Sequence, residues 1–218
     1  MSIKQNDFVE IDYIGYNKED NSVFDTTLEQ VAKQNELHHE GHDCKPAIIC
    51  VGQHQILKAI DESLIGKSSG EKFSIELTPE NSFGKKNPEL IQFIPISSYR
   101  DSQINPVPGL PVDIDGSYGI VKIVSGGRTL VDFNHPLAGK SVKYEITINR
   151  IVEDKKEKLS AYLSGIMGFE PEIEIKDSEA ILKVPKGIEE HEKEIQDKVK
   201  EVIPEITTLK FTQIADKK

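Results

Sequence analysis

The sequence predicts an α+β fold, and two observations support that prediction. Apolar and polar residues alternate over 9–13, 73–77 and 142–148, which is the period of a strand with one buried face. Apolar residues instead recur at helical spacing over 56–64, and Gly66 follows where a C-terminal cap is expected. We therefore expect three strands to line one core and one short helix to face the sheet that they form.

The segment over 86–138 differs from the residues before it, because prolines interrupt any long regular element. Three short runs inside it, over 112–114, 120–124 and 129–133, have strand character and are separated by glycine-containing turns. These runs predict a small antiparallel β domain, inserted between two parts of a first domain over 1–85 and 139–153.

The last segment, over 154–218, predicts a further unit with the order α-β-β-α-β. A helix around 159–166 ends at Gly168, two strands occupy 172–184, a second helix over 188–202 ends before Pro204, and a strand closes the unit over 207–214. A unit of this size has a marginal core when it stands alone. We therefore expect it to gain stability by packing on a partner or on a second copy.

Composition excludes several classes of function. The chain has 218 residues, with 37 acidic and 27 basic side chains and a net charge of -10, so its surface repels a phosphate backbone and no nucleic acid partner is expected. No apolar run approaches the length of a membrane helix, and the first residues lack the apolar stretch of a signal peptide, which predicts a cytoplasmic protein with no membrane partner. Cys44 and Cys50 are too few for a disulfide framework and are predicted to be thiols. Motifs of common hydrolases and kinases, such as GxSxG and the P-loop, are absent from the sequence.

One set of aromatic and aliphatic residues surrounds a single acid. It comprises Tyr13 and Gly15, the run Val23-Phe24-Asp25-Thr26-Thr27, Val51-Gly52 before the predicted helix, Asn81-Ser82-Phe83-Gly84, and Tyr144. At these residues, over about 1–85 and 139–152, the chain resembles the FKBP-type peptidyl-prolyl cis/trans isomerases. The run DFNHPLAGK over 132–140, with the insert before it, is similar to the SlyD-like branch, in which a chaperone domain replaces the flap of the simpler isomerase. The C-terminal unit is similar to that of the long archaeal members of this branch.

The resemblance implies a half-open antiparallel β-barrel around one short helix, with a proline-binding pocket between them. We expect no cofactor and no metal, because the histidine-rich tail through which some SlyD-like proteins bind nickel or zinc is missing from this sequence. Carried over by position, the residues that would line this pocket are Tyr13, Phe24, Asp25, Ile56, Leu57, Ile60, Phe83 and Tyr144. The sequence departs from the best-known members at Ile60, Phe83 and Ala47, where a tryptophan, a tyrosine and another aromatic residue often stand.

A dry apolar pocket is sufficient for such a reaction. Amide resonance opposes rotation of the peptide bond by about 18–20 kcal/mol, and a thousandfold acceleration requires only about 4 kcal/mol. A site that binds the twisted amide supplies this without a nucleophile, a metal or a proton transfer. We expect the Tyr13 hydroxyl to donate to Asp25, since an acid beside aromatic rings is costly to bury without a hydrogen bond.

The insert contains more apolar residues than a domain of about 50 residues readily hides. The resemblance implies that they bind unfolded, proline-containing polypeptides next to the pocket. The expected client-binding residues are Ile91, Phe93, Ile94, Ile96, Leu110, Val112, Ile120 and Val131. The alternatives are that they form only the core of the insert, or that the protein is a holdase chaperone or peptide-binding module with weak or no isomerase activity.

Two further features leave alternatives open. The loop His38-His39-His42-Asp43-Cys44 is the cluster richest in metal-ligand side chains, but its spacing matches no closed tetrahedral site, so we expect a solvated loop and no metal. For the C-terminal unit, a homodimer interface is preferred over a second client-binding surface or a docking site for another protein.

Overall fold

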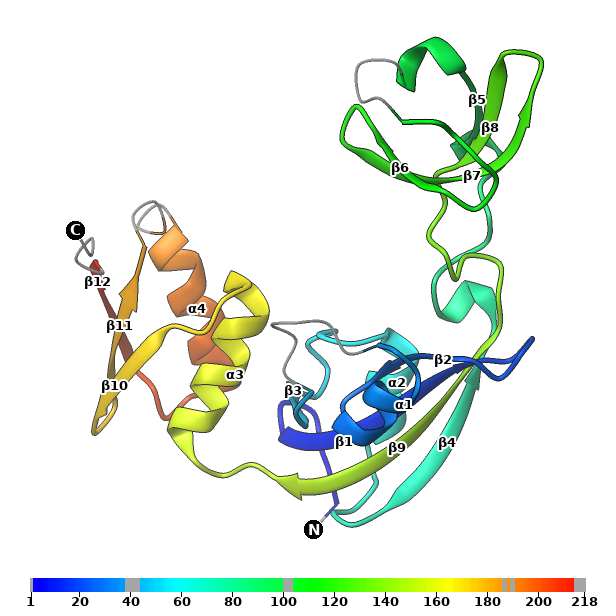
Figure 1. Cartoon of the computed structure of the whole chain (residues 1–218). Helices are drawn as coiled ribbons and strands as arrows, with labels where there is room; N and C mark the ends of the chain where they lie inside the picture. The colour runs from blue at the N-terminus through cyan, green and yellow to red at the C-terminus, as the bar shows by residue number, and fades with distance from the viewer. Residues whose placement is uncertain (1, 38–43, 100–103, 186–187, 189–190, 214–218) are drawn as a thin grey trace. The chain divides into compact units, whose positions relative to one another are not determined.

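The computed structural model describes residues 2–37, 44–99, 104–185, 188 and 191–213. These residues form two compact units (Figure 1). Unit one contains 1–16, 20–76 and 143–218, and unit two contains 17–19 and 77–142. The predicted insert over 86–138 therefore falls within unit two, and the predicted C-terminal domain falls within unit one.

Unit one is built on a five-stranded sheet with the order β2-β1-β9-β4, in which β3 also pairs with β1. The strands are β1 (Phe8–Asn17), β2 (Val23–Thr26), β3 (Ala47–Cys50), β4 (Lys72–Leu77) and β9 (Val142–Ile151). β1 pairs antiparallel with β2 over its second half and with β3 over its first half. Three of these strands, β1, β4 and β9, are the segments with alternating polarity, and the predicted combination of antiparallel strands with a few helices is confirmed.

Side chains on both faces of β1 are buried. Val9 and Ile11 are fully buried on one face, together with Ile60 and Leu64 of the short helix α2 (Lys58–Leu64) in the core of the chain. Phe8 points to the opposite face because side chains alternate along a strand. It is also buried, but in a core that it shares with the C-terminal elements. Another short helix, α1 (Glu29–Gln34), follows β2.

The C-terminal elements follow the order α3 (Lys155–Met167), β10 (Glu172–Lys176), β11 (Glu179–Val184), α4 (Glu192–Val202) and β12 (Thr208–Gln213). β11 lies between β10, to which it is antiparallel, and β12, to which it is parallel. The Asp154 side chain caps α3 by accepting from the first free N–H groups of the helix. α4 starts at Glu192, four residues after the predicted start at Ile188, and residues 189–190 lie outside the described part of the chain.

The core of the C-terminal elements continues into the β1–β3 end of the main sheet. Phe8, Cys50 and Val152 belong to the same buried cluster as Leu159 and Tyr162 of α3, and the rings of Phe8 and Tyr162 meet edge to face with centroids 6.3 Å apart. The C-terminal elements therefore complete a hydrophobic core with the main sheet.

Unit two contains a four-stranded antiparallel sheet with the order β5-β8-β7-β6. Its strands are β5 (Ile91–Pro95), β6 (Pro111–Ile114), β7 (Ser117–Ser125) and β8 (Arg128–Asp132). One face of the sheet covers a small core of Tyr99, Val112, Val121 and Val131. The Tyr99 hydroxyl and the Thr129 hydroxyl are hydrogen-bonded at 2.7 Å, which satisfies both polar groups inside this core.

Two other sequence expectations concern the cysteines and the membrane. Cys44 and Cys50 are free thiols, as predicted. In the part of the chain that the structure describes, no helix is both long enough and apolar enough to span a bilayer.

Candidate functional site

Three strands of unit one bring four of the predicted pocket residues together. Tyr13 lies on β1, Phe24 and Asp25 on β2, and Tyr144 on β9. The Tyr144 ring contacts the Tyr13 ring at a centroid distance of 5.9 Å and the Phe24 ring at 5.6 Å, both edge to face. We name these four residues the aromatic cluster.

Gly15 makes the close approach of these rings possible. It is paired with Asp25 across β1 and β2, and a Cβ atom at this position would lie 2.8 Å from Phe24 Cζ and 3.1 Å from Tyr144 Cε1. Both distances are shorter than the normal contact between carbon atoms. The absence of a side chain at Gly15 therefore lets Phe24 and Tyr144 meet over the strand.

The predicted hydrogen bond between Tyr13 and Asp25 is present. The Tyr13 hydroxyl donates to Asp25 Oδ2 at 3.0 Å. Burial raises the pKa of Tyr13 well above its ordinary value, and the negative Asp25 raises it further. The pKa of Tyr144 is raised by the same two causes, in the same order. Both phenols thus stay protonated at neutral pH beside one carboxylate.

Two threonines that follow Asp25 fix the backbone of Tyr13. The Thr26 hydroxyl donates to the Tyr13 carbonyl at 2.9 Å, and the Tyr13 N–H donates to the Thr27 hydroxyl at 2.9 Å. Strand periodicity does not predict this role of the two threonines. Their position directly after Phe24-Asp25 could have predicted it, because threonine hydroxyls often form hydrogen bonds with nearby backbone groups.

Ile56, Leu57 and Ile60 lie at the start of α2. Ile60 is buried with an exposed fraction of 5%, whereas Ile56 and Leu57 are half-buried in the turn that leads into the helix. The preceding turn is held by Asp61, whose carboxylate accepts from the Gly52 and His54 N–H groups at 2.8 and 3.0 Å.

Phe83, the remaining predicted pocket residue, belongs to unit two. Its ring stacks face to face on His135, with centroids 4.6 Å apart and an interplanar angle of 2°. The His135 Nδ1 atom accepts from the Leu137 N–H at 3.2 Å. The expectation that Phe83 lines the pocket remains a prediction.

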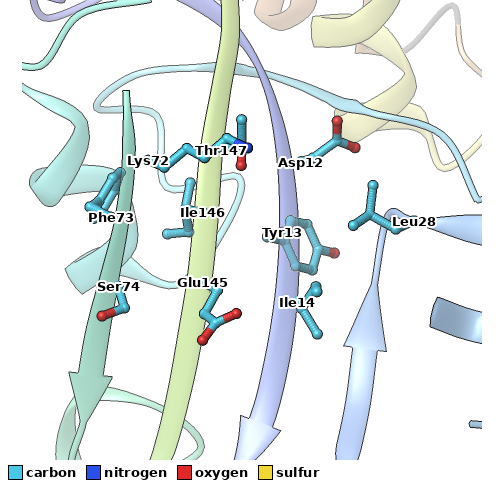
Figure 2. Close-up of a pocket in the computed structure, with 10 residues that line it drawn as sticks. All are labelled: Asp12, Tyr13, Ile14, Leu28, Lys72, Phe73, Ser74, Glu145, Ile146 and Thr147. Atoms are coloured by element: carbon cyan, nitrogen blue, oxygen red, sulfur yellow. The ribbon is translucent and has the colours of Figure 1, made fainter. Parts of the chain in front are cut away.

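Figure 2 shows a groove of about 390 Å³ formed by β1, β9 and β4, with Leu28 beside β1. Tyr13 of the aromatic cluster also lines this groove, whereas Asp12 and Ile14, its neighbours along β1, point to the other face of the sheet from Tyr13. Two of the charged groups in the groove already have partners, because Asp12 accepts from Thr27 and Asn149 and Glu145 accepts from Lys143. We therefore do not assign the groove a substrate.

A cleft of about 710 Å³ separates β3 from α3. Ala47 and Ile48 form its wall on the β3 side, and Ser160, Ala161 and Ser164 form the opposite wall. The Ser160 and Ser164 hydroxyls are both engaged, with Glu170 and with the Ser160 carbonyl. Glu157 also lines the cleft, and its buried Oε2 atom, which has no hydrogen bond, forms an ion pair with Arg150 Nη1 at 2.9 Å.

The predicted client-binding residues lie on both faces of the sheet in unit two. Val112 and Val131 are buried in the core with exposed fractions of 3% and 0%, and Ile94 and Leu110 pack against that core. A client could contact Val112 or Val131 only if this core opened. Ile96 follows β5 and is half-buried.

The opposite face of the sheet is apolar and exposed. Phe93 on β5 is paired with Leu130 on β8, which is paired with Ile123 on β7, so the three side chains form one row across the sheet. Phe93 is 70% exposed and Ile123 is 54% exposed. We name the apolar residues of this side the outer insert face: Ile91, Phe93, Tyr118, Ile120, Ile123 and Leu130.

Sequence reasoning missed Tyr118, Ile123 and Leu130 on the outer insert face. The register of β7 shifts between Val121 and Ile123. Such a bulge moves Ile123 to the face opposite Val121, although both are odd-numbered residues of one strand. Tyr118 is 59% exposed, and the signal in the sequence is its alternation with Gly119 and Val121, which places Tyr118 and Val121 on opposite faces of the strand.

The histidine-containing loop, predicted to be solvated and free of metal, is not tested, because His38, His39, His42 and Asp43 lie outside the described residues. Within the described ranges, no group of three or more histidine, cysteine or acidic side chains has the geometry to hold a metal ion.

Comparison with known proteins places this geometry in a family. A family model for "FKBP-type peptidyl-prolyl cis-trans isomerase" matches residues 1–98, and a model for "FKBP26, IF domain" matches residues 92–137. The chain is 31% identical to a short-type peptidyl-prolyl cis-trans isomerase from Methanocaldococcus jannaschii over 155 residues, which are 71% of this chain and 98% of the relative.

Two bacterial relatives extend the comparison. A probable FKBP-type 16 kDa peptidyl-prolyl cis-trans isomerase from Pseudomonas fluorescens is 33% identical over 49% of this chain and 73% of the relative. An FKBP-type isomerase SlyD from Vibrio cholerae is 28% identical over 44% of this chain and 50% of its own length. The resemblance that the sequence motifs indicated is thus confirmed, and the chain belongs to the family of FKBP-type peptidyl-prolyl cis-trans isomerases, which are enzymes.

Proposed function

We propose that this enzyme rotates X-Pro bonds against the aromatic cluster and holds unfolded clients on the outer insert face. The observation that carries the first half is the convergence of Tyr13, Phe24 and Tyr144 around Asp25 on three strands. The second half rests on the row of exposed apolar side chains across β5, β8 and β7.

The aromatic cluster suits the chemistry of amide rotation. An X-Pro bond isomerises unaided in tens to hundreds of seconds, because rotation must break amide resonance. The planar amide is the more charge-separated form, so an apolar wall favours the twisted form over it. Rings that are held by edge-to-face contacts do not have to reorganise during rotation. No proton has to leave either phenol, which agrees with the raised pKa of Tyr13 and Tyr144.

Asp25 has two parts in this proposal. It anchors the Tyr13 ring through the 3.0 Å hydrogen bond, and it keeps a negative group at the edge of the pocket. As the amide twists, its nitrogen loses conjugation and its carbonyl carbon becomes more electron-poor. A carboxylate near that carbon stabilises the twisted state more than the planar one.

The outer insert face suits an extended apolar segment of an unfolded chain. Phe93, Tyr118 and Ile123 are each more than half exposed, and contiguous exposed apolar surface of this kind marks an interaction site. A client bound here remains tethered while its prolines exchange at the pocket, which raises their effective concentration without any new contact at the pocket.

A holdase that binds clients with weak or no catalysis is the second candidate, and the same exposed face favours it. The two candidates differ on a short X-Pro peptide, which fits the pocket but is too small to need the tether. Only the first candidate predicts accelerated isomerisation of such a peptide.

The decisive experiment compares a short X-Pro peptide with a protein whose refolding is limited by proline. The full chain is assayed beside the double variant Phe93→Ser/Ile123→Ser, whose side chains are exposed and outside the insert core. Lys122→Ser, an exposed change on the same strand, is the matched control. We expect the double variant to lose about tenfold or more on the refolding protein and to keep the peptide rate. Equal loss on both substrates would argue against the tether, and inactivity of the full chain on both would favour the holdase.

We also propose that the chain forms a homodimer through its C-terminal elements. α3 and α4 bury their apolar sides in the shared core, and in the described part of the chain β10 and β12 are the edge strands of this sheet, a position from which strands can pair with a second copy. Light scattering at high protein concentration should then give twice the monomer mass, and a monomer would remove this part of the proposal.

A further inference from the structure

The turn between β3 and α2 is conformationally unusual. Gly52 has φ of +90° and His54 has φ of +54°, so two residues of one short turn adopt the left-handed region. For a residue with a Cβ atom this conformation is strained and persists only where the surroundings hold it. Gly52 has a further constraint, because a Cβ atom there would overlap the Gln5 side chain.

One side chain holds both residues. The Asp61 carboxylate is only 2% exposed, and it accepts from the Gly52 N–H at 2.8 Å and from the His54 N–H at 3.0 Å. The His54 Nδ1 atom lies 3.4 Å from Asp61 Oδ2. Backbone N–H groups that converge in this way form an anion-binding concavity, and here a carboxylate from the chain fills it.

A second side chain in this turn is also anchored, because Gln55 Oε1 accepts from the Cys50 N–H at 2.7 Å. Leu57 occupies the N-cap position and makes no side-chain cap hydrogen bond. The beginning of the turn is tied to the N-terminal segment, because the Asn6 N–H donates to the Val51 carbonyl at 2.9 Å and Gln53 Nε2 donates to Asn6 Oδ1 at 3.2 Å. Asp61 and Gln55 therefore both fix the path from His54 to Leu57, and Asp61 is the side chain that binds the two residues with positive φ.

We propose that Asp61 is a positioning residue of the isomerase, which fixes the turn over 52–57 and so sets where Ile56 and Leu57 stand. Asp61 itself is buried, so it acts through the backbone of the turn and not on the substrate. The inference rests on the proposed function, because it takes Ile56 and Leu57 as walls of the proline pocket.

The test replaces Asp61 by asparagine, which keeps the shape but can accept from only one of the two N–H groups without turning its own amide N–H toward the other. Asp154→Asn is the control for loss of the charge alone, because Asp154 accepts from the Lys156 and Glu157 N–H groups, each at 2.9 Å, with the single oxygen Oδ1, which asparagine retains. The assay is isomerisation of a short X-Pro peptide at a temperature where both variants are folded.

We expect kcat/KM of Asp61→Asn to fall about tenfold or more, mainly through a higher KM, since displaced apolar walls weaken contact with the substrate throughout rotation. Asp154→Asn should stay within about twofold of the unaltered chain. Adding His54→Gly should restore part of the loss, because glycine adopts positive φ without strain. An unchanged KM in folded Asp61→Asn would overturn the proposal.

A measurement on the unaltered chain covers the case in which Asp61→Asn does not fold. The amide hydrogens of Gly52 and His54 should exchange with solvent as slowly as those inside α2, because both donate to a buried carboxylate. Fast exchange at both positions would also overturn the proposal. If the unaltered chain fails to isomerise the peptide, the proposed function fails first; if it is active and Asp61→Asn matches it, only the role of Asp61 is wrong.

Discussion

Replacement of Gly15 by alanine is the sharpest test of how the aromatic cluster is built. The added Cβ atom would stand 2.8 Å from Phe24 Cζ and 3.1 Å from Tyr144 Cε1. Carbon atoms prefer about 3.5–4.0 Å, so both rings must retreat by roughly 0.5–1 Å. Overpacking of this kind costs about 1–3 kcal/mol, of which the lower entropy of the unfolded alanine chain offsets about 0.4–1 kcal/mol.

We therefore expect Gly15→Ala to lower the free energy of unfolding by about 1–2 kcal/mol and to reduce kcat/KM on a short X-Pro peptide. Urea unfolding and peptide isomerisation measure the two effects. Phe24→Leu removes the nearer of the two clashing rings, so Gly15→Ala should be less harmful in that background, with a coupling of about 1 kcal/mol in a double-mutant cycle. Additive effects, or a Gly15→Ala variant with unaltered stability and rate, would refute the steric reasoning.

Three further predictions concern single side chains. Tyr13→Phe removes the donor to Asp25, and we expect a loss of about 1–3 kcal/mol in stability together with a lower peptide rate; unchanged values of both would show that the hydrogen bond is dispensable. Burial and Asp25 raise the pKa of Tyr13 and Tyr144 in the folded state. The two protonated tyrosines therefore contribute their full stabilisation below the ordinary tyrosine pKa of about 10, and this stabilisation is lost as pH rises above it. Melting temperatures across this range should fall more steeply for the unaltered chain than for Tyr13→Phe, and equal slopes would contradict the linkage. Burial raises the pKa of Cys50 to about 12, so a thiol reagent near neutral pH should label Cys44 alone in the full chain. In a chain truncated before Asp154, which lacks the elements that cover Cys50, the reagent should label both cysteines. Fast labelling of Cys50 in the full chain would contradict the shared core.

Strand periodicity predicted the part of the site that a regular sheet determines. Val9, Ile11 and Tyr13 alternate with polar residues, which places Tyr13 on the buried side of β1, where it meets Tyr144 of β9. The acid at Asp25 pointed to a hydrogen-bond donor because a carboxylate beside aromatic rings needs one. Both inferences need only local sequence and the chemistry of single side chains.

Features that depend on register or on distant segments could not be predicted in this way. The bulge in β7 exchanges the faces of Val121 and Ile123, and no local pattern marks it. β5 was obscured by Pro95, which is tolerated because β5 is an edge strand. Phe8 alternates with the core residues of β1 and is nevertheless buried, because elements more than 150 residues away in sequence cover it. In the sequence, Asp61 resembles an acid on the solvent-exposed face of a helix. In the structure it is buried, because its carboxylate accepts from backbone N–H groups of the turn before the helix.

The most direct test of the central claim is to locate a bound proline in the protein. Intermolecular nuclear Overhauser effects can be measured between a short X-Pro peptide and the full chain with labelled aromatic and methyl groups. The account predicts contacts from the proline ring to Phe24 and Tyr144, and their loss in Asp25→Ala if the acid holds the pocket in place. Contacts to Ile14 and Leu28 in the groove of Figure 2 instead would contradict the assignment of the aromatic cluster as the proline pocket.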